Sequence, residues 1–156
     1  MADNPQGVFI DDVEFPFDES SSILEFSNKS LGEKIIPTLC DDVNLKPYGA
    51  CRVCSVEVQH TEDGPKRTVA SCHTPINPGM RIYTNSDSVK TLRRNIVELV
   101  LSDHPPDCLT CEVNGNCELQ DVAASVGVRR IRYAKGKNHC DREKDLSHAY
   151  MRMDLS

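Results

Sequence analysis

Two groups of cysteines are spaced as the ligands of a metal centre would be. The first follows the pattern C-x10-C-x2-C-x17-C and contains Cys40, Cys51, Cys54 and Cys72. A C-x2-C pair lets two thiolates converge on one metal unit across a short turn, and the two other cysteines supply the remaining ligands. Four thiolates are what a [2Fe–2S] cluster requires, two for each iron.

A zinc ion is the alternative occupant of this first group. Zinc accepts four thiolates, but structural zinc sites usually contain two close pairs of ligands, whereas here only one pair is close. The loop before the close pair contains Gly49 and Ala50. Such small residues allow backbone N–H groups to approach the bridging sulfides and tune the potential of a cluster, so the pattern favours iron and sulfide.

The second group has the spacing H-x3-C-x2-C-x5-C and four candidate ligands, His104, Cys108, Cys111 and Cys117. Pro105 disfavours α geometry at His104, so the imidazole can turn toward the cysteines. A tight turn at residues 114–116 brings Cys117 back to the start of a helix, where free N–H groups stabilise a thiolate. These donors suit one compact metal site. A zinc ion bound by three cysteines and one histidine is a serious alternative to an iron–sulfur cluster, and spacing alone does not show whether His104 is a ligand.

Cys140 lies outside both patterns, and we expect it to be a free thiol. A hydrolase or transferase with a nucleophilic cysteine would have to use it, yet the nearest histidine in sequence, His139, is adjacent and poorly placed to act as its base. The chain also contains no Gly-rich phosphate loop. We therefore predict no catalytic residue, and no flavin, nicotinamide, molybdopterin or hydrogen-activating site.

The elements that must position the first group are short. Alternating apolar residues bounded by turn residues predict strands at residues 8–10, 13–17, 55–59, 67–71 and 80–84. Residues 23–30 are predicted to form a helix, capped within residues 20–22 and followed by Gly32. The cysteines of the first group then lie in loops or at strand ends.

Helical spacing of apolar residues begins further along the chain. A helix is predicted over residues 87–101, with Asp87 as its N-cap, and it is expected to open a second lobe. A shorter helix is predicted over residues 118–126, with Gly127 as its stop and one apolar face made of Leu119, Val122, Ala123 and Val126. After Tyr133 the pattern fades and an extended tail is expected.

Composition limits the environment and the partners. The formal net charge of −6 argues against nucleic acid, which needs a basic face. No apolar run approaches the length of a membrane span, and the N-terminus does not read as a secretory signal, so we expect a cytoplasmic protein whose clustered cysteines bind metal. Residues 1–28 are acidic and residues 129–137 are basic, which is typical of solvated faces or of surfaces that orient a protein on partner subunits.

Both cysteine patterns, in this order, resemble a known redox family. SDHPPDCLTCEVNGNCELQD is similar to the one-histidine, three-cysteine cluster motif of the N-terminal iron–sulfur region that three kinds of subunit share. These are the large iron–sulfur subunit of respiratory NADH dehydrogenase (complex I), [FeFe]-hydrogenases, and the alpha subunit of NAD-linked formate dehydrogenases. PYGACRVCSVEV, ASCHTPINPGMRI and LRRNIVEL resemble the family too. VGVRRIRY, together with ASCHTP and SDHPPDCLTC, looks most like formate dehydrogenase, with hydrogenase next.

The resemblance implies an α+β fold and two clusters. A β-grasp, ferredoxin-like [2Fe–2S] domain would occupy residues 1–85, a small helical [4Fe–4S] lobe residues 86–133, and an extended tail residues 134–156. Carried over by position, the [2Fe–2S] ligands are Cys40, Cys51, Cys54 and Cys72. The [4Fe–4S] ligands are His104, Cys108, Cys111 and Cys117.

The resemblance also implies an activity. The chain would be an electron-transfer component of a hetero-oligomeric NAD(P)-linked oxidoreductase, passing single electrons between a flavin/NAD-binding subunit and a catalytic subunit. Alternatively, it is the N-terminal piece of a longer catalytic subunit of the same family. A zinc-stabilised interaction module, which belongs to a different functional class, is a further alternative.

Overall fold

The computed structural model describes residues 7–32, 34–105, 107–134 and 144–153. The fold is of the α+β class, with a mixed sheet and three helices in the described part of the chain. The chain divides into two compact units, Met1–Ile96 and Val97–Ser156, so the boundary falls inside a helix. Each unit is described by itself below. No helix in the described segments is both long and apolar enough to cross a membrane.

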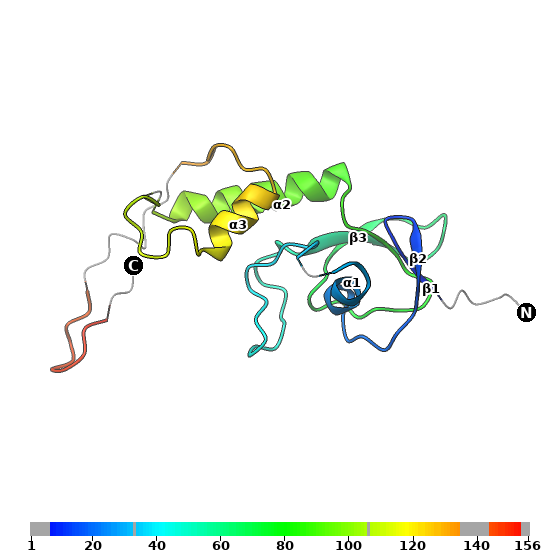
Figure 1. Cartoon of the computed structure of the whole chain (residues 1–156), viewed down its shortest axis with the longest axis horizontal. Coiled ribbons are helices and arrows are strands. Elements are labelled where there is room, and N and C mark those ends of the chain that lie inside the picture. The colour runs from blue at the N-terminus through cyan, green and yellow to red at the C-terminus, as the bar shows by residue number, and fades with distance from the viewer. Residues whose placement is uncertain (1–6, 33, 106, 135–143, 154–156) are drawn as a thin grey trace, which may run out of the picture. The chain divides into compact units, whose positions relative to one another are not determined.

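The first unit is built on a five-stranded sheet in the order β2-β1-β5-β3-β4. Figure 1 labels β1, β2 and β3 of this sheet together with the helix of the same unit. Its strands are β1 (Gly7–Ile10), β2 (Val13–Pro16), β3 (Ser55–Gln59), β4 (Arg67–Ala70) and β5 (Arg81–Tyr83). β1 runs parallel to β5, and the other neighbouring pairs are antiparallel. All five predicted strands are therefore present, and β3 has the predicted bounds.

The predicted N-terminal hairpin is confirmed. Ile10 pairs with Val13, and the two residues between them, Asp11 and Asp12, have φ values of 46° and 66°. Two consecutive positive φ angles are the signature of the tight turns whose twist matches that of a hairpin, and aspartate tolerates them better than most residues. Asp11 also accepts a hydrogen bond from the Thr84 backbone N–H at 2.7 Å, which ties the turn to the end of β5.

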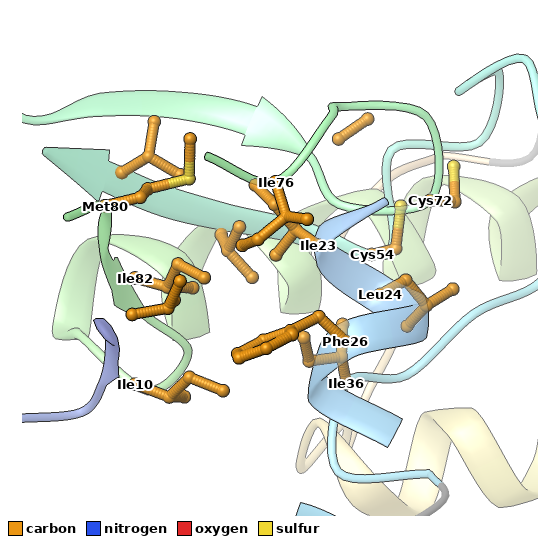
Figure 2. Close-up of a cluster of buried hydrophobic side chains, with 14 residues drawn as sticks. Ile10, Ile23, Leu24, Phe26, Ile36, Cys54, Cys72, Ile76, Met80 and Ile82 are labelled. Atoms are coloured by element: carbon orange, nitrogen blue, oxygen red, sulfur yellow. The ribbon is translucent and has the colours of Figure 1, made fainter. Parts of the chain in front are cut away.

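The core forms where α1 (Ile23–Leu31) packs with the sheet residues, as Figure 2 shows. Phe26 and Ile23 of the helix are buried with Ile10 and Ile82 of the strands. Ser22 caps the helix as predicted, because its hydroxyl accepts the Glu25 N–H at 3.2 Å. Cys54 and Cys72 belong to the same buried cluster, beside Leu24 and at the end away from Ile10 (Figure 2). The core thus reaches the first cysteine group directly.

The second helix differs from its prediction at both ends. α2 spans Asp87–Asp103, and its N-cap is Ser86 rather than Asp87, because the Ser86 hydroxyl accepts the Val89 N–H at 3.3 Å. A serine reaches this N–H with a short side chain, and Asp87 then contributes its charge to the first turn. The helix ends two residues later than predicted, just before His104.

The helix α3 (Glu118–Ser125) lies in the second unit, with Cys117 at its N-cap as predicted. Val122 is its buried apolar residue, and Gly127, with φ 72°, follows the helix and donates to the Ala124 carbonyl at 3.1 Å. The segment after α3 is fixed to α2 by Arg132, whose Nε lies 2.6 Å from the buried Oε2 of Glu98. In the predicted tail, Asp145 and Met153 form an isolated antiparallel bridge, and Cys140 lies outside the described residues.

Candidate iron–sulfur centres

The structure brings the four cysteines of the first group together as two pairs. Cys40 and Cys51 are hydrogen-bonded to each other, and so are Cys54 and Cys72. Cys72 also interacts electrostatically with Cys40, which joins the pairs into one group. Cys54 and Cys72 are 1% and 3% exposed, and the other two are half-buried. Two pairs of thiols, one of them shielded from water, are the donor set that a two-iron cluster needs.

Backbone N–H groups surround these sulfur atoms. Cys40 receives a hydrogen bond from Ala50, Cys51 from Val53, and Cys72 from Gly49. Gly49 has a φ of 70°, a left-handed conformation that favours glycine and turns its N–H toward the cysteines. The sequence predicted that small residues here would admit backbone N–H groups, and in the structure these groups reach the cysteine sulfurs. Such hydrogen bonds stabilise negative charge on a cluster.

Burial and thiol contacts set the proton affinity of the group. Burial raises the pKa of Cys72 to about 12, and the neighbouring Cys54 thiol adds to the rise. Burial raises the pKa of Cys40 as well. Burial acts in the same sense on Cys51, but the Val53 N–H and the Cys40 thiol outweigh it and lower its pKa. Binding of iron would release the protons that burial retains, because a metal supplies the positive charge that thiolates need.

A second layer of hydrogen bonds holds the cysteine-bearing backbone. The Cys54 carbonyl accepts the Ser71 hydroxyl at 2.8 Å and the Ser71 N–H at 3.3 Å, which couples the two members of one thiol pair. The Ser55 hydroxyl donates to the Arg52 carbonyl at 2.6 Å and closes the C-x2-C turn. Cysteine spacing gave no signal for either serine.

Arg93 is a further residue that the cysteine patterns did not reveal. Its guanidinium donates to the Ser55 carbonyl through Nε at 3.0 Å and Nη2 at 2.7 Å, and the residue is only 6% exposed. Burial lowers its pKa to about 10, while Cys54 and Asp11 act against the fall. A signal was present in the sequence, because Arg93 lies four residues from both Val89 and Val97, two fully buried positions on α2.

The second group lies on the chain between α2 and α3. His104, Cys108 and Cys111 are exposed, and Cys117 is half-buried. The segment makes successive turns, with the Cys111 N–H on the Cys108 carbonyl at 3.3 Å and the Asn114 N–H on the Cys111 carbonyl at 3.1 Å.

Gln120 of α3 braces the return of this segment. Its Oε1 accepts the Gly115 N–H at 3.1 Å, and its Nε2 donates to Asn114 Oδ1 at 2.9 Å. Gly115 has a φ of 81°. The predicted tight turn is therefore held from the helix that Cys117 caps. Sequence reasoning did not single out Gln120, although it lies three residues after Cys117, the last cysteine of the second group.

His104 has one ring nitrogen engaged. Nδ1 lies 2.9 Å from the Pro105 carbonyl oxygen. When Nδ1 carries the proton it donates to this carbonyl, and Nε2 is then the nitrogen with a free lone pair for a metal. This tautomer follows from the contact with the neighbouring backbone, and it is the arrangement expected of a histidine ligand.

The donor sets can be tested against a single ion and against a cluster. In the described segments, no three His, Cys, Asp or Glu side chains converge closely enough to hold one metal ion. A cluster distributes its ligands over two or more irons, so its donors need not meet at one point. The two thiol pairs of the first group fit that requirement. The thiolate and imidazole donors of the second group are of the types that bind a cluster. The successive turns of the segment keep its three cysteines close together in the chain.

Comparison with protein families agrees with this chemistry. The model of a 2Fe-2S iron-sulfur cluster binding domain matches residues 7–87, which is more than half of the chain. The chain belongs to this family. The model of the NADH-ubiquinone oxidoreductase-G iron-sulfur binding region matches residues 93–132, which contain the whole second group. A [2Fe–2S]-binding and a [4Fe–4S]-binding region thus follow each other in the order that the motifs indicated.

Individual relatives are subunits of NAD(P)-dependent oxidoreductases. The NADP-reducing hydrogenase subunit HndD of Solidesulfovibrio fructosivorans is 41% identical over 140 residues, which cover 86% of this chain and 23% of the relative. The G subunit of NADH-quinone oxidoreductase from Rickettsia typhi is 34% identical over 145 residues, covering 92% and 20%. The NADPH-Fe(3+) oxidoreductase subunit alpha of Geobacter sulfurreducens is 39% identical over 98 residues, covering 63% and 11%. The chain therefore spans less than a quarter of these relatives.

A solved structure extends the similarity to three dimensions. The crystal structure of an NAD+-reducing [NiFe]-hydrogenase in the H2-reduced state matches with a TM-score of 0.75 and 28% sequence identity, covering 92% of this chain and 57% of that one. The resemblance drawn from the cysteine motifs, to complex I and hydrogenase subunits, is confirmed. The predicted α+β, ferredoxin-like fold is confirmed as well.

Proposed function

We propose that this chain is an iron–sulfur electron-transfer component of a multisubunit NAD(P)-linked oxidoreductase, passing single electrons between a flavin/NAD-binding subunit and a catalytic subunit. The observation that carries the proposal is the grouping of Cys40, Cys51, Cys54 and Cys72 as two pairs surrounded by backbone N–H groups. The relatives, which are subunits of hydrogenases and of NADH- or NADPH-dependent oxidoreductases, support it.

In this proposal the four paired cysteines hold one [2Fe–2S] cluster. The second group, His104, Cys108, Cys111 and Cys117, holds one [4Fe–4S] cluster, with Nε2 as the histidine ligand atom. The clusters supply reversible one-electron chemistry, and an all-thiolate [2Fe–2S] centre of the plant type lies near about −400 mV, within reach of nicotinamide couples. The residues of the chain bind the clusters and fix their positions, and the hydrophobic core around Cys54 and Cys72 limits the access of water to the first cluster.

The proposed division of labour follows the two family matches. The ferredoxin-like domain, residues 1–85, would carry the [2Fe–2S] cluster, and the helical lobe, residues 86–133, the [4Fe–4S] cluster. We propose a cytoplasmic location, because reduced thiols and cluster ligation are compatible with a reducing compartment. The flavin/NAD-binding and catalytic subunits would form a hetero-oligomer with the chain.

The first experiment is iron, sulfide and zinc analysis of anaerobically purified protein, with EPR spectroscopy of the dithionite-reduced sample. About six irons per chain, two plus four, and two overlapping reduced signals are expected. About two zinc ions per chain without an EPR signal would instead establish the zinc-stabilised interaction module. Cys140→Ala is the control, since this cysteine lies outside both patterns and its loss should leave the iron content unchanged.

Substitution of His104 separates the two clusters. His104→Cys should retain about six irons and change only the faster-relaxing [4Fe–4S] signal, because a thiolate replaces the imidazole at one corner. The [2Fe–2S] signal should be identical to that of the unsubstituted protein. A spectrum unchanged in both signals would remove His104 from the ligand set.

We propose a formate dehydrogenase as the complex to which this chain belongs, with a hydrogenase as the second candidate. The stretches ASCHTP, SDHPPDCLTC and VGVRRIRY favour a formate dehydrogenase. The 41% identity to a hydrogenase subunit favours a hydrogenase as the second candidate. The complex isolated anaerobically through a tag on this chain should reduce NAD(P) with formate and not with hydrogen. Hydrogen-dependent reduction without formate-dependent reduction would select the second candidate.

A further inference from the structure

The buried guanidinium of Arg93 forms no ion pair in the described part of the chain. Both of its hydrogen bonds go to a neutral acceptor, the Ser55 carbonyl. No carboxylate in the described residues forms an ion pair with it. Buried cations are costly unless they are paired, so an arginine at 6% exposure points to an anion beyond those with which the described residues could form an ion pair.

The position of Arg93 identifies that anion. The Ser55 carbonyl that it binds belongs to the residue directly after Cys54, and the guanidinium acts electrostatically on Cys54 itself. Cys54 is paired with Cys72 in the first cysteine group. Asp11 also acts electrostatically on Arg93 but forms no ion pair with it, and its carboxylate instead accepts the Thr84 N–H and hydroxyl.

The charge of the proposed cluster has the required sign. A [2Fe–2S] cluster with four thiolate ligands has a net negative charge, and reduction adds one more electron. A cation held in a low-dielectric interior stabilises the reduced form more than the oxidised form, and thereby raises the potential. Such a cation is also screened by salt much less than a surface charge would be.

We propose that Arg93 is the counter-cation of the [2Fe–2S] cluster, raising its midpoint potential while it fixes the backbone beside Cys54. This inference rests on the proposed function, because it requires the cluster to be bound by the first cysteine group. Arg93 acts as a positioning and tuning residue, and its contact with the cysteine-bearing backbone links the helix α2 to the cluster.

The test is an EPR-monitored redox titration of the full chain, purified anaerobically with its clusters. Arg93→Gln removes the charge but keeps one donor for the Ser55 carbonyl, and Arg93→Lys keeps the charge but loses the two-pronged contact. Arg94→Gln is the matched control, because Arg94 is the next residue on the same helix and is exposed. Arg93→Gln should shift the [2Fe–2S] midpoint to lower potential, while Arg93→Lys and Arg94→Gln stay near the unsubstituted value.

The other possible results of the redox titration either support the proposal or overturn it. Loss of the [2Fe–2S] cluster in Arg93→Gln with retention in Arg93→Lys would support the proposal, because charge alone would then rescue cluster binding. An unchanged midpoint in Arg93→Gln would overturn it. Equal shifts in the Gln and Lys variants, loss of the cluster in both, or an equal shift in Arg94→Gln would also overturn it.

Failure of the proposed function is recognised separately. If the unsubstituted protein contained no [2Fe–2S] signal and no iron, the electron-transfer function would fall before any Arg93 variant was made. If the unsubstituted protein showed the signal and Arg93→Gln left its midpoint unchanged, only the role of Arg93 would fall.

Discussion

Substitution of Gly49 by alanine is the sharpest perturbation of the first cysteine group. Gly49 has a φ of 70°, and its N–H donates to Cys72. A Cβ at this position would lie 3.1 Å from His73 Cδ2 and 3.3 Å from Ala70 Cβ. The alanine is therefore strained by its backbone conformation and is crowded from two sides, and any relief moves the N–H away from the sulfur.

The expected cost has two parts. The left-handed conformation costs an alanine roughly 1–2 kcal/mol. Crowding adds roughly 1–3 kcal/mol, as overpacking in a tight interior does. For a unit of this size, each kcal/mol lowers the thermal midpoint by roughly 4–8 °C. The [2Fe–2S] signal of Gly49→Ala should therefore be lost at a temperature at least about 8 °C below that of the unsubstituted protein.

A double-mutant cycle separates the two parts. His73 is exposed, so His73→Ala alone should cost within about 0.5 kcal/mol, and in that background Gly49→Ala should recover part of the crowding cost. Gly127→Ala is the conformational control, because Gly127 has a φ of 72° and open space where the Cβ would stand. The assay is the midpoint for loss of each cluster signal on heating under argon. Additive effects in the cycle, or a loss no greater than in Gly127→Ala, would refute the crowding argument.

Two further predictions concern helix ends and the second unit. Hydrogen bonds from Ser21 and an ion pair with Lys29 lower the pKa of Glu25 from its ordinary 4.5 to about 2. A lowered pKa contributes stability above about pH 4.5 that is lost as pH falls toward 2, so Glu25→Gln should lower the thermal midpoint at pH 7, and the difference should shrink through that range. A difference independent of pH would contradict this. Glu98→Ala, which removes the buried carboxylate that Arg132 Nε contacts at 2.6 Å, should lower the urea midpoint of the second unit and expose the segment after Arg129 to trypsin. Glu112→Ala, at an exposed position, should do neither.

Local signals predicted most of the secondary structure. The bounds of β3 followed from alternating valines, and the Ser22 cap of α1 followed from residue type. The N-cap position of Cys117 in α3 followed from the turn that precedes it. These features depend on residues only a few positions apart, so the local sequence pattern is enough to predict them. The N-cap of α2 was misplaced by one residue, because serine and aspartate are both good caps and the sequence presents them side by side.

The spacing of the cysteines by itself indicated the donor set of the first group and the three cysteines of the second. The resemblance of both motifs to the redox family supplied His104 and the order of the two clusters. The spacing did not determine which thiols pair, because Cys54 and Cys72 are brought together by the β3–β4 hairpin and by the Ser71 bonds to the Cys54 carbonyl. Cysteine spacing also gave no indication of the proposed role of Arg93, although this residue lies midway in sequence between two buried valines of α2. Only the tertiary structure places Arg93 beside the first cysteine group, since the Ser55 carbonyl that accepts its hydrogen bonds is 38 residues away in the sequence. Ligand types are local properties of a sequence, whereas the electrostatic surroundings of a cluster depend on how distant segments fold together.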